Sequence, residues 1–480
     1  MGDSSRDGRL CPAVALIRAL RFCAVPLGPL AFAAAILWTS PASALPSFAG
    51  QTGLPCSACH VGGFGPQLTP FGIAFRATGY TQRGGDGPWS HIPINLVWSP
   101  SFQTDAVALP AAPQGYGTNN FFNALGTGTA LYIAGGTSLG GGLGIGGFEQ
   151  WGFSVVPGGS IIGSEATSDL KITKRLSLGD HSLLLGFDFT NTPSGGDPYN
   201  TLYNGFAYPY LAPFVGPVPS ASPIISALGT TVYGLSLYAL YDNRLYAEVG
   251  FYQTWDPGIL SAMNVAPSAL GTIAGSAPYV RFAYQQSWNN NFLEIGGVLF
   301  DPTLQQVPGA LSPSAQNQYV DWGFDATYQR TVGSDIFSIT GNVLFEAQTL
   351  GASFAAGVSA NPTDYLTQLR IAASYYWNNT YGVTLAYAGT SGSTDTGLYA
   401  PAPLTGSASG SPNSQAIIAQ IDWTPFGRST SEAGYPWLNV RVGLQYTYYL
   451  QFNGGTTNYD GSGRNASDNN TLLLFTWWAF

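Results

Sequence analysis

The residues best suited to do chemistry are the five at positions 56–60, Cys-Ser-Ala-Cys-His. Two cysteines separated by two residues and followed at once by a histidine form the attachment motif of a c-type haem. In that chemistry Cys56 and Cys59 form thioethers with the vinyl groups of the porphyrin, and His60 ligates the iron. The spacing lets both sulfur atoms reach one edge of the macrocycle. The motif therefore predicts one covalently bound c-type haem.

Three other uses of such a cysteine pair compete with haem attachment: a disulfide, a redox-active dithiol and half of a zinc site. A structural zinc ion needs four protein ligands, and the chain beyond residue 44 contains no other cysteine. A thioredoxin-like dithiol needs a strand-helix-strand context, which the sequence around the motif does not indicate. Haem attachment is the use that fits best.

Residues 1–44 are typical of a secretory signal peptide. Four arginines precede an apolar run from Ala24 to Trp38, and Ala42-Ser43-Ala44 offers a small-residue cleavage site. Cys11 and Cys23 lie in this segment, so the mature chain keeps only the two motif cysteines. We expect export from the cytoplasm and no structural disulfide within one mature chain.

The composition indicates a membrane protein without spanning helices. Charged residues make up 9% of the chain, against about 25% in a soluble domain. Beyond residue 44 the chain carries 12 basic and 23 acidic residues and no basic cluster, so nucleic acid is not an expected partner. No mature run reaches the roughly 18 apolar residues of a spanning helix. A closed barrel is the remaining way to cross a bilayer.

Alternation of apolar and polar residues is clearest over residues 437–450 and recurs over 244–254 and 367–376. This is the pattern of a barrel strand with one face toward lipid and the other toward the lumen. Counting such segments predicts an all-β, antiparallel outer-membrane barrel of about 16 strands. The expected strands begin near Ile94, Thr129, Leu143, Thr167, Ser182, Thr231, Asn243, Pro278, Asn291, Gln318, Asp335, Thr363, Asn379, Gln415, Trp437 and Asn470. The charged residues expected to face the lumen are Glu248, Glu294, Arg370, Asp422 and Arg441.

The connections between these strands alternate between tight turns, such as Asp242-Asn243, and long loops rich in Gly, Ser and Pro. Short turns of outer-membrane barrels face the periplasm, so we expect both ends of the barrel sequence on that side. The tryptophans expected to form an aromatic girdle there are Trp288, Trp377, Trp423, Trp437 and Trp478.

The residues after the haem motif predict a short helix over 69–80. Thr69 suits the N-cap, Pro70 the first helical position and Gly79 the C′ position. The side chains of Phe71, Ala74, Phe75 and Thr78 would share one face, which either covers the porphyrin or packs against the barrel wall.

The chain is thus divided into a signal peptide (1–44), a monohaem plug (45–91) and a transmembrane barrel (92–480). A segment of about 45 residues is too small to form its own core. We expect it to enter the lumen from the periplasmic side and to hold the haem where both sides of the membrane can approach it. The remaining candidates for the second axial ligand are His91, which is nearest to the plug, His181 and Met263.

The segment around the motif resembles the fused cytochrome-porins of the bacterial outer membrane. The resemblance rests on the haem motif together with Phe48-Ala49, Gln51-Thr52-Gly53, Pro66, Leu68, Phe71-Gly72, Phe75-Arg76 and Gly79-Tyr80. Gly50 departs from the pattern, since many relatives carry arginine there. The family includes the iron-oxidising outer-membrane cytochromes. It therefore implies oxidation of extracellular Fe(II), or of another donor, and transfer of the electron through one haem to a periplasmic cytochrome or copper protein.

Two other functions are compatible with the sequence. One is electron export to extracellular acceptors, and the other is a passive diffusion porin with a structural haem plug. A large single-channel conductance would favour the porin, whereas haem reduction driven by an external donor would favour the electron conduit. No nucleophile, base and acid are grouped for hydrolytic chemistry, and the chain has 3 histidines in all.

Overall fold

The computed structural model describes residues 45–85, 92–112, 117–125, 128–155, 161–202, 206, 216–305 and 315–480. The predicted signal peptide and the predicted plug boundary at residue 91 therefore lie outside the described residues. Residues 38–480 form one compact unit. No helix in the described part of the chain is long and apolar enough to span a bilayer.

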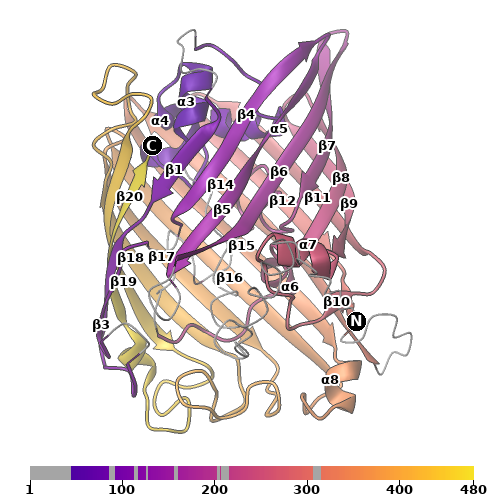
Figure 1. Ribbon diagram of the computed structural model, residues 1–480, viewed down its shortest axis with the longest axis vertical. Coiled ribbons are helices and arrows are strands. Elements are labelled where there is room, and N and C mark those ends of the chain that lie inside the picture. Colours follow the sequence, from indigo (N-terminus) through magenta and orange to yellow (C-terminus); the bar gives the residue numbers. More distant parts are fainter. Residues whose placement is uncertain are drawn as a thin grey trace, which may run out of the picture. The chain divides into compact units, whose positions relative to one another are not determined.

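Within the described residues the chain forms one closed antiparallel barrel of 16 strands, which confirms the predicted fold class (Figure 1). Four of the 16 barrel strands are interrupted, and each of these four comprises two labelled segments. In chain order the barrel strands are β1 (Ile94–Trp98) with β2 (Ser101–Asp105), β3 (Asn120–Asn123) with β4 (Ala130–Gly140), β5 (Leu143–Val155), β6 (Ile161–Leu178), β7 (His181–Thr190), β8 (Val232–Tyr241), β9 (Leu245–Thr254), β10 (Thr272–Ile273) with β11 (Ala277–Trp288), β12 (Asn291–Phe300) with β13 (Thr303–Gln305), β14 (Gln316–Val332), β15 (Asp335–Thr349), β16 (Thr363–Trp377), β17 (Tyr381–Gly392), β18 (Ser414–Trp423), β19 (Asn439–Gln451) and β20 (Thr471–Ala479).

The first and last strands close the barrel. β1 pairs with β20 through Val97 opposite Ala479, and β2 continues the same pairing with Ser101 opposite Phe475. β20 also pairs with β19, so both of its edges are occupied. Closure satisfies the backbone donors and acceptors that an open sheet edge would leave exposed to lipid.

Burial follows the predicted alternation. On β16 the side chains of Leu369 and Ile371 are 44% and 49% exposed on the outer wall, whereas Arg370 between them is 1% exposed. Successive side chains of a strand point to opposite faces, so the charged residue is directed inward. The five charged residues predicted to face the lumen are all buried, as the alternation requires.

The turns confirm the predicted asymmetry between the two ends of the barrel. Asp242 and Asn243 both have a φ of 51°, as the tight hairpin turns favoured between strands require. The connection of residues 424–438 between β18 and β19 is the exception at this end, and the other long connections lie at the opposite strand ends. Trp288, Trp377 and Trp423 are 40%, 60% and 45% exposed at the short-turn ends of their strands, where the aromatic girdle was expected.

The helical segments are short. They are α3 (Pro46–Thr52), α4 (Cys56–Cys59), the 3-10 turn η1 (Val61–Gly63), α5 (Pro70–Ala77), α6 (Ile224–Ala227), α7 (Pro257–Ala262), α8 (Gly351–Ala355) and the 3-10 turn η5 (Ala466–Asn469). Figure 1 shows α3, α4 and α5 at the end of the barrel where the chain terminates, which is the end with the short turns.

The connection between β7 and β8 enters the lumen in its described parts. Near its start, Asp197 forms an ion pair with Arg281 of β11. Near its end, the backbone N–H groups of Ile224 and Ile225 donate to the carboxylates of Glu346 and Asp321 on the inner wall. The described residues of this connection (191–202, 206 and 216–231), referred to below as the inserted loop, and the N-terminal segment (residues 45–85) therefore both occupy the interior of the barrel.

Candidate haem site

The haem motif is held in a compact turn. Cys56 to Cys59 form the single helical turn α4, and the N–H of His60 donates to the carbonyl of Cys56 at 2.9 Å. His60 then pairs with Leu68 in an isolated antiparallel bridge. The chain returns from this bridge directly into α5. The motif and the following helix consequently form one unit.

Helix α5 begins and ends where the sequence predicts. The side chain of Thr69 accepts from the N–H of Gly72, and Pro70 occupies the first helical position. Gly79 has a φ of 70°, the left-handed conformation that a helix-terminating glycine provides. Thr69 also ties the helix to the motif, because its N–H donates to the carbonyl of Cys59 at 2.9 Å.

Gly72 permits the close approach of α5 to the motif. A Cβ at this position would lie 2.2 Å from the carbonyl oxygen of Cys59. Real carbon contacts are optimal at about 3.5–4.0 Å, so no larger residue fits without displacement. The glycine brings the helix axis close enough for Phe75 and Arg76, one turn later, to reach the same cavity as the cysteines.

A cavity lies beside the motif. Both cysteines and His60 line it. The remaining lining is mainly apolar and comes partly from the N-terminal segment, through Leu45, Phe48, Leu68 and Phe75, and partly from the barrel wall, through Tyr132 of β4 and Phe148 of β5.

Aromatic packing fixes one side of this cavity. The ring of Phe48 stacks on Tyr80 and meets Phe75 edge to face, both at a centroid distance of 5.1 Å. Tyr80 in turn meets Phe148 edge to face at 6.2 Å. Aromatic pairs in such arrangements stabilise the packing by more than the burial of their surface area alone. The N-terminal segment and the barrel thus share one aromatic wall.

His60 is 8% exposed, and its Nδ1 atom has no hydrogen-bond partner within the described structure. Burial, assisted by the positive charge of Arg441, lowers the pKa of His60 to about 4. The imidazole is therefore neutral near pH 7, which is the form that binds a metal. Burial also raises the pKa of Cys56 to about 12, so its thiol stays protonated. A neutral imidazole and two thiols on one apolar cavity fit a c-type haem.

The N-terminal segment contacts the inner wall around the whole barrel. Its hydrogen bonds reach seven strands: Ser47 to Asn95 on β1, Gln51 to Gly136 on β4, Arg76 to Asp169 on β6, Ala77 to Tyr238 on β8, Leu68 to Gln329 on β14, Gln67 to Ser338 on β15 and Gly63 to Asn439 on β19. Contacts with strands on all sides place the segment inside the lumen. The contacted residues at positions 238, 329, 338 and 439 lie in the strand halves near the short turns.

Two buried arginines anchor the segment. Arg76 binds Asp169 of β6 through Nε at 3.2 Å and Nη2 at 3.1 Å, and its Nη1 donates to the carbonyl of Asp197 in the inserted loop at 2.8 Å. Arg441 of β19 donates to the carbonyl of Gly65 at 3.0 Å and pairs with Asp422 at 3.3 Å. Arg76 thereby joins the segment, the wall and the inserted loop.

The structure corrects the predicted porphyrin-facing side of α5. Of the four residues expected there, Phe75 lines the cavity, while Phe71, Ala74 and Thr78 do not. Gly72 and Arg76 line it instead. The close contact between Gly72 and Cys59 sets the rotation of the helix, and it directs Ile73 and Ala77 to the barrel wall near Tyr238.

The candidates for a second axial ligand do not converge on the cavity. His181 is the first residue of β7, where its Nδ1 atom is 2.6 Å from Asp242, and its side chain is 57% exposed. Met263 follows α7 among the long loops. His91 lies outside the described residues. The described part of the chain also holds no cluster of three or more His, Cys, Asp or Glu residues able to bind a metal ion.

Sequence reasoning did not identify Tyr132, Phe148, Arg76 or Tyr80 as cavity residues. The strand alternation carries a signal for the first two, since it directs both inward. The pairing of Arg76 and Tyr80 with Asp169, at 2.8 Å for the tyrosine hydroxyl, joins residues about 90 positions apart and leaves no local pattern.

No protein-family model and no curated protein sequence matches the chain. Solved structures of outer-membrane proteins are similar at low identity. OmpT of Vibrio cholerae matches with a TM-score of 0.42 at 10% identity, over 81% of this chain and 97% of OmpT. The anion-selective porin of Comamonas acidovorans matches with a TM-score of 0.44 at 13% identity, over 81% of this chain and 98% of the porin. OmpF of Salmonella typhi, solved with daunomycin, matches with a TM-score of 0.44 at 11% identity, over 81% of this chain and 97% of OmpF.

Proposed function

We propose that the chain is an outer-membrane electron-transfer protein that carries one c-type haem on Cys56, Cys59 and His60. The observation that supports this most directly is the apolar cavity on which the two thiols and the neutral imidazole converge. The donor is extracellular Fe(II) or another one-electron reductant, and the acceptor is a periplasmic cytochrome or copper protein. When bound, the haem supplies a one-electron redox centre.

The residues of the chain bind and enclose that centre. Cys56 and Cys59 supply the covalent attachment, and His60 supplies an axial nitrogen. Phe48, Phe75 and the barrel residues around them give the cavity a mainly apolar lining that limits contact between the bound centre and water. A dry, low-dielectric site shifts the potential of a redox centre and limits side reactions of the iron with solvent.

The barrel determines which compartments the centre can serve. An even number of antiparallel strands, an apolar outer wall and an aromatic girdle are features of bacterial outer-membrane barrels. Their short turns face the periplasm, and here the haem segment contacts the short-turn half of the lumen. We therefore assign the acceptor to the short-turn end and the donor to the long-loop end.

Covalent attachment is tested by haem staining of denatured protein. Wild type should retain haem, and Cys59→Ser should lose most of it while keeping the barrel, as judged by the heat-dependent gel shift of folded barrels. The control Ser57→Ala alters the motif without removing a thiol and should stain like wild type. Haem-free wild-type protein after expression with a cytochrome maturation system would contradict the proposal.

A passive porin with a structural plug is the second candidate, and the closed 16-strand barrel favours it. The N-terminal segment and the inserted loop both occupy the lumen, so we expect a small conductance in planar bilayers. In intact cells, a membrane-impermeant donor should reduce the haem. Porin-sized conductance together with haem that is reduced only after cell lysis would establish the porin instead.

The direction of electron flow is tested by the midpoint potential of the haem at the working pH. A potential above that of the external donor and below that of the periplasmic carrier supports inward transfer. The reverse order supports export to extracellular acceptors.

A further inference from the structure

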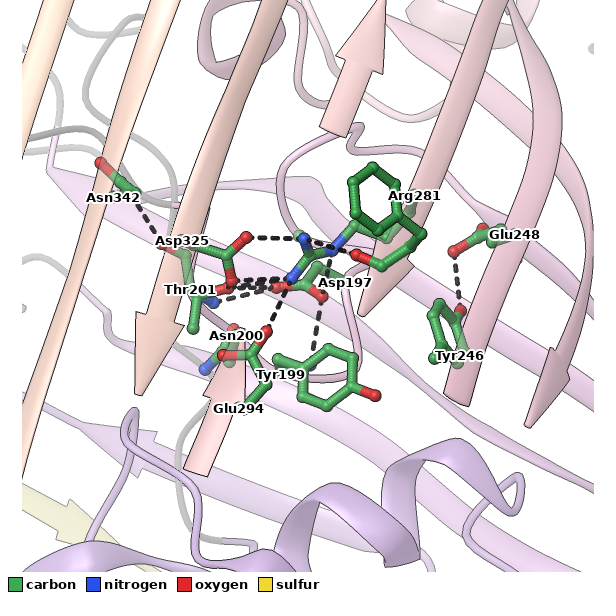
Figure 2. Close-up of polar contacts among 12 residues, drawn as sticks. Asp197, Tyr199, Asn200, Thr201, Tyr246, Glu248, Arg281, Glu294, Asp325 and Asn342 are labelled. Carbon is green, nitrogen blue, oxygen red and sulfur yellow. Dashed lines mark hydrogen bonds and ion pairs between the residues drawn. The ribbon is translucent and has the colours of Figure 1, made fainter. Parts of the chain in front are cut away.

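Beyond the haem cavity, one guanidinium is surrounded by three carboxylates inside the barrel. Arg281 of β11 contacts Asp197 of the inserted loop at 3.1 Å and Asp325 of β14 at 2.6 Å, and its Nη2 atom lies 3.5 Å from Glu294 of β12 (Figure 2). None of the four side chains is more than 3% exposed. We refer to these four residues as the Arg281 cluster.

The charges of the Arg281 cluster do not balance. Three ionised carboxylates around one guanidinium would leave two uncompensated negative charges in a site without solvent. Burial of an unpaired charge costs several kcal/mol, so buried acids take up a proton instead. Two other guanidiniums lie beside the cluster: Arg76 donates to the backbone carbonyl of Asp197 and pairs with Asp169, and Arg370 donates to the backbone carbonyl of Thr201. Even with the charge of Arg370 counted, three ionised carboxylates outnumber the two cations, Arg281 and Arg370. At least one acid of the cluster must therefore be neutral.

Hydrogen bonding identifies that acid. Asp197 accepts from the N–H groups of Tyr199 and Thr201 and from the hydroxyl of Thr201. Asp325 accepts two bonds from Arg281, and it shares the one hydroxyl hydrogen of Thr201 with Asp197. Among the described residues, neither oxygen of Glu294 receives a hydrogen bond. Donors stabilise the ionised form, and Glu294 lacks them.

Among the described residues, the charged and titratable groups that face Glu294 from the surrounding elements are Arg281 on β11, Asp325 on β14, and Asp197 and Tyr199 on the inserted loop. The ring of Tyr199 lies 5.5 Å from the guanidinium of Arg281. Two of these groups are acidic, one is a phenol and one is a cation already shared between two carboxylates. The surroundings therefore favour the protonated form of Glu294.

The Arg281 cluster is connected to the haem cavity through a single residue. Arg76 lines the cavity, and its Nη1 atom donates to the carbonyl of Asp197 at 2.8 Å. Asp197 binds Arg281 through its carboxylate. In the dry interior, charges interact more strongly than in water. A change of charge in the cavity therefore alters the proton affinity of Glu294.

We propose that Glu294 is a proton-binding site whose proton affinity depends on the redox state of the haem. The inference rests on the proposed function. At a pH within the interval in which Glu294 titrates, the arrival of one electron from the external donor raises the proton affinity of its ionised form, and one proton from solvent then binds a carboxylate oxygen and forms an O–H bond. When the periplasmic carrier removes the electron, that bond breaks and the proton returns to solvent. The residue thereby offsets the charge that electron transfer adds to the interior.

The linkage is tested by redox titration of the haem-loaded protein in detergent over a range of pH. In wild type, the midpoint potential should fall as pH rises across the interval in which Glu294 titrates. A tenfold change in proton activity corresponds to at most about 59 mV for a one-electron couple. Glu294→Gln should lose this contribution, whereas Asp256→Asn, which alters an exposed acid at the N-cap of α7 in the long connection after β9, should titrate like wild type.

A second variant covers the case in which Glu294→Gln fails to fold. Asp325→Asn removes one of the two competing carboxylates, so Glu294 should ionise more easily. The pH interval over which the midpoint potential falls should then move to lower pH. Identical potential–pH curves for wild type and for whichever of these variants folds would overturn the proposal.

Infrared spectroscopy separates this inference from the proposed function. The carbonyl band of a protonated carboxylic acid should be present in wild type and reduced in Glu294→Gln, and it should also be seen in the haem-free Cys56→Ser/Cys59→Ser protein. If wild type binds no haem but the band depends on Glu294, the electron-transfer function fails and the proton site stands. If haem is bound but the band is unaffected by Glu294→Gln, the proton site fails alone.

Discussion

The contact between Gly72 and Cys59 makes a quantitative prediction for Gly72→Ala. The new Cβ would lie 2.2 Å from the carbonyl oxygen of Cys59 and 3.0 Å from its carbonyl carbon, and backbone atoms cannot rotate away. Overpacking of this kind costs about 1–3 kcal/mol. Alanine recovers about 1 kcal/mol through its helix propensity. The docking of α5 on the haem motif should therefore weaken by up to about 2 kcal/mol.

Amide hydrogen exchange measures that loss directly and does not depend on haem. The N–H groups of His60 and Thr69, which donate to the carbonyls of Cys56 and Cys59, report on the motif. A loss of about 2 kcal/mol corresponds to roughly 30-fold faster exchange. The control Ala74→Gly lowers helix propensity by about 1 kcal/mol without a clash, so it should accelerate exchange within α5 but spare His60. Unchanged exchange at both amides in Gly72→Ala would refute the packing argument.

Three further predictions concern the segment, its thiols and the long loops. Arg76→Met removes one partner of a buried ion pair, which should cost the docking of the N-terminal segment about 3 kcal/mol. Protease should therefore cleave the segment more readily in this variant, whereas the control Arg83→Met alters an exposed residue and should leave the cleavage rate unchanged. Because burial raises the pKa of Cys56 to about 12, its thiol in haem-free Cys59→Ser protein should alkylate slowly at about pH 8 and quickly once unfolded; equal rates would contradict this. Asp395 is buried, but the N–H groups of residues 360, 361, 397 and 398 hold its pKa below the ordinary value. Its stabilisation is therefore present above about pH 4 and is lost as pH falls through the lower, folded-state pKa. Asp395→Asn should thus be less stable than wild type at neutral pH by about 1–2 kcal/mol in urea titrations, and a difference that persists in strong acid would count against this account.

The barrel could be predicted from the sequence because the alternation of apolar and polar residues along each strand reflects which side chains face lipid and which face the lumen. Residues 367–376 alternate between lipid-facing and inward-facing positions, and this pattern survives without any knowledge of neighbouring strands. The helix after the motif was also predictable, since Thr69, Pro70 and Gly79 act locally at its ends. Local rules thus gave the elements and their order.

The interior could not be predicted, because its contacts join distant residues. Arg76 and Asp169 are separated by 93 positions, and Arg281 and Asp197 by 84. The alternation indicated that Glu294 faces inward, but it could not show that a guanidinium and two more carboxylates surround it. The rotation of α5 could not be predicted for the same reason, since it depends on a contact with Cys59 rather than on the helix's own pattern.

The anchoring of the N-terminal segment constrains how the molecule is assembled. Tyr435 bonds the carbonyl of Ala49 across 386 positions, and Asn439 bonds that of Gly63 across 376. The part of the chain synthesised first is therefore secured by residues synthesised almost last. Contacts of such long sequence separation form late and slowly. Until β19 and β20 complete the cylinder, the cysteines remain open to the enzymes that would attach a porphyrin, and barrel closure ends that interval.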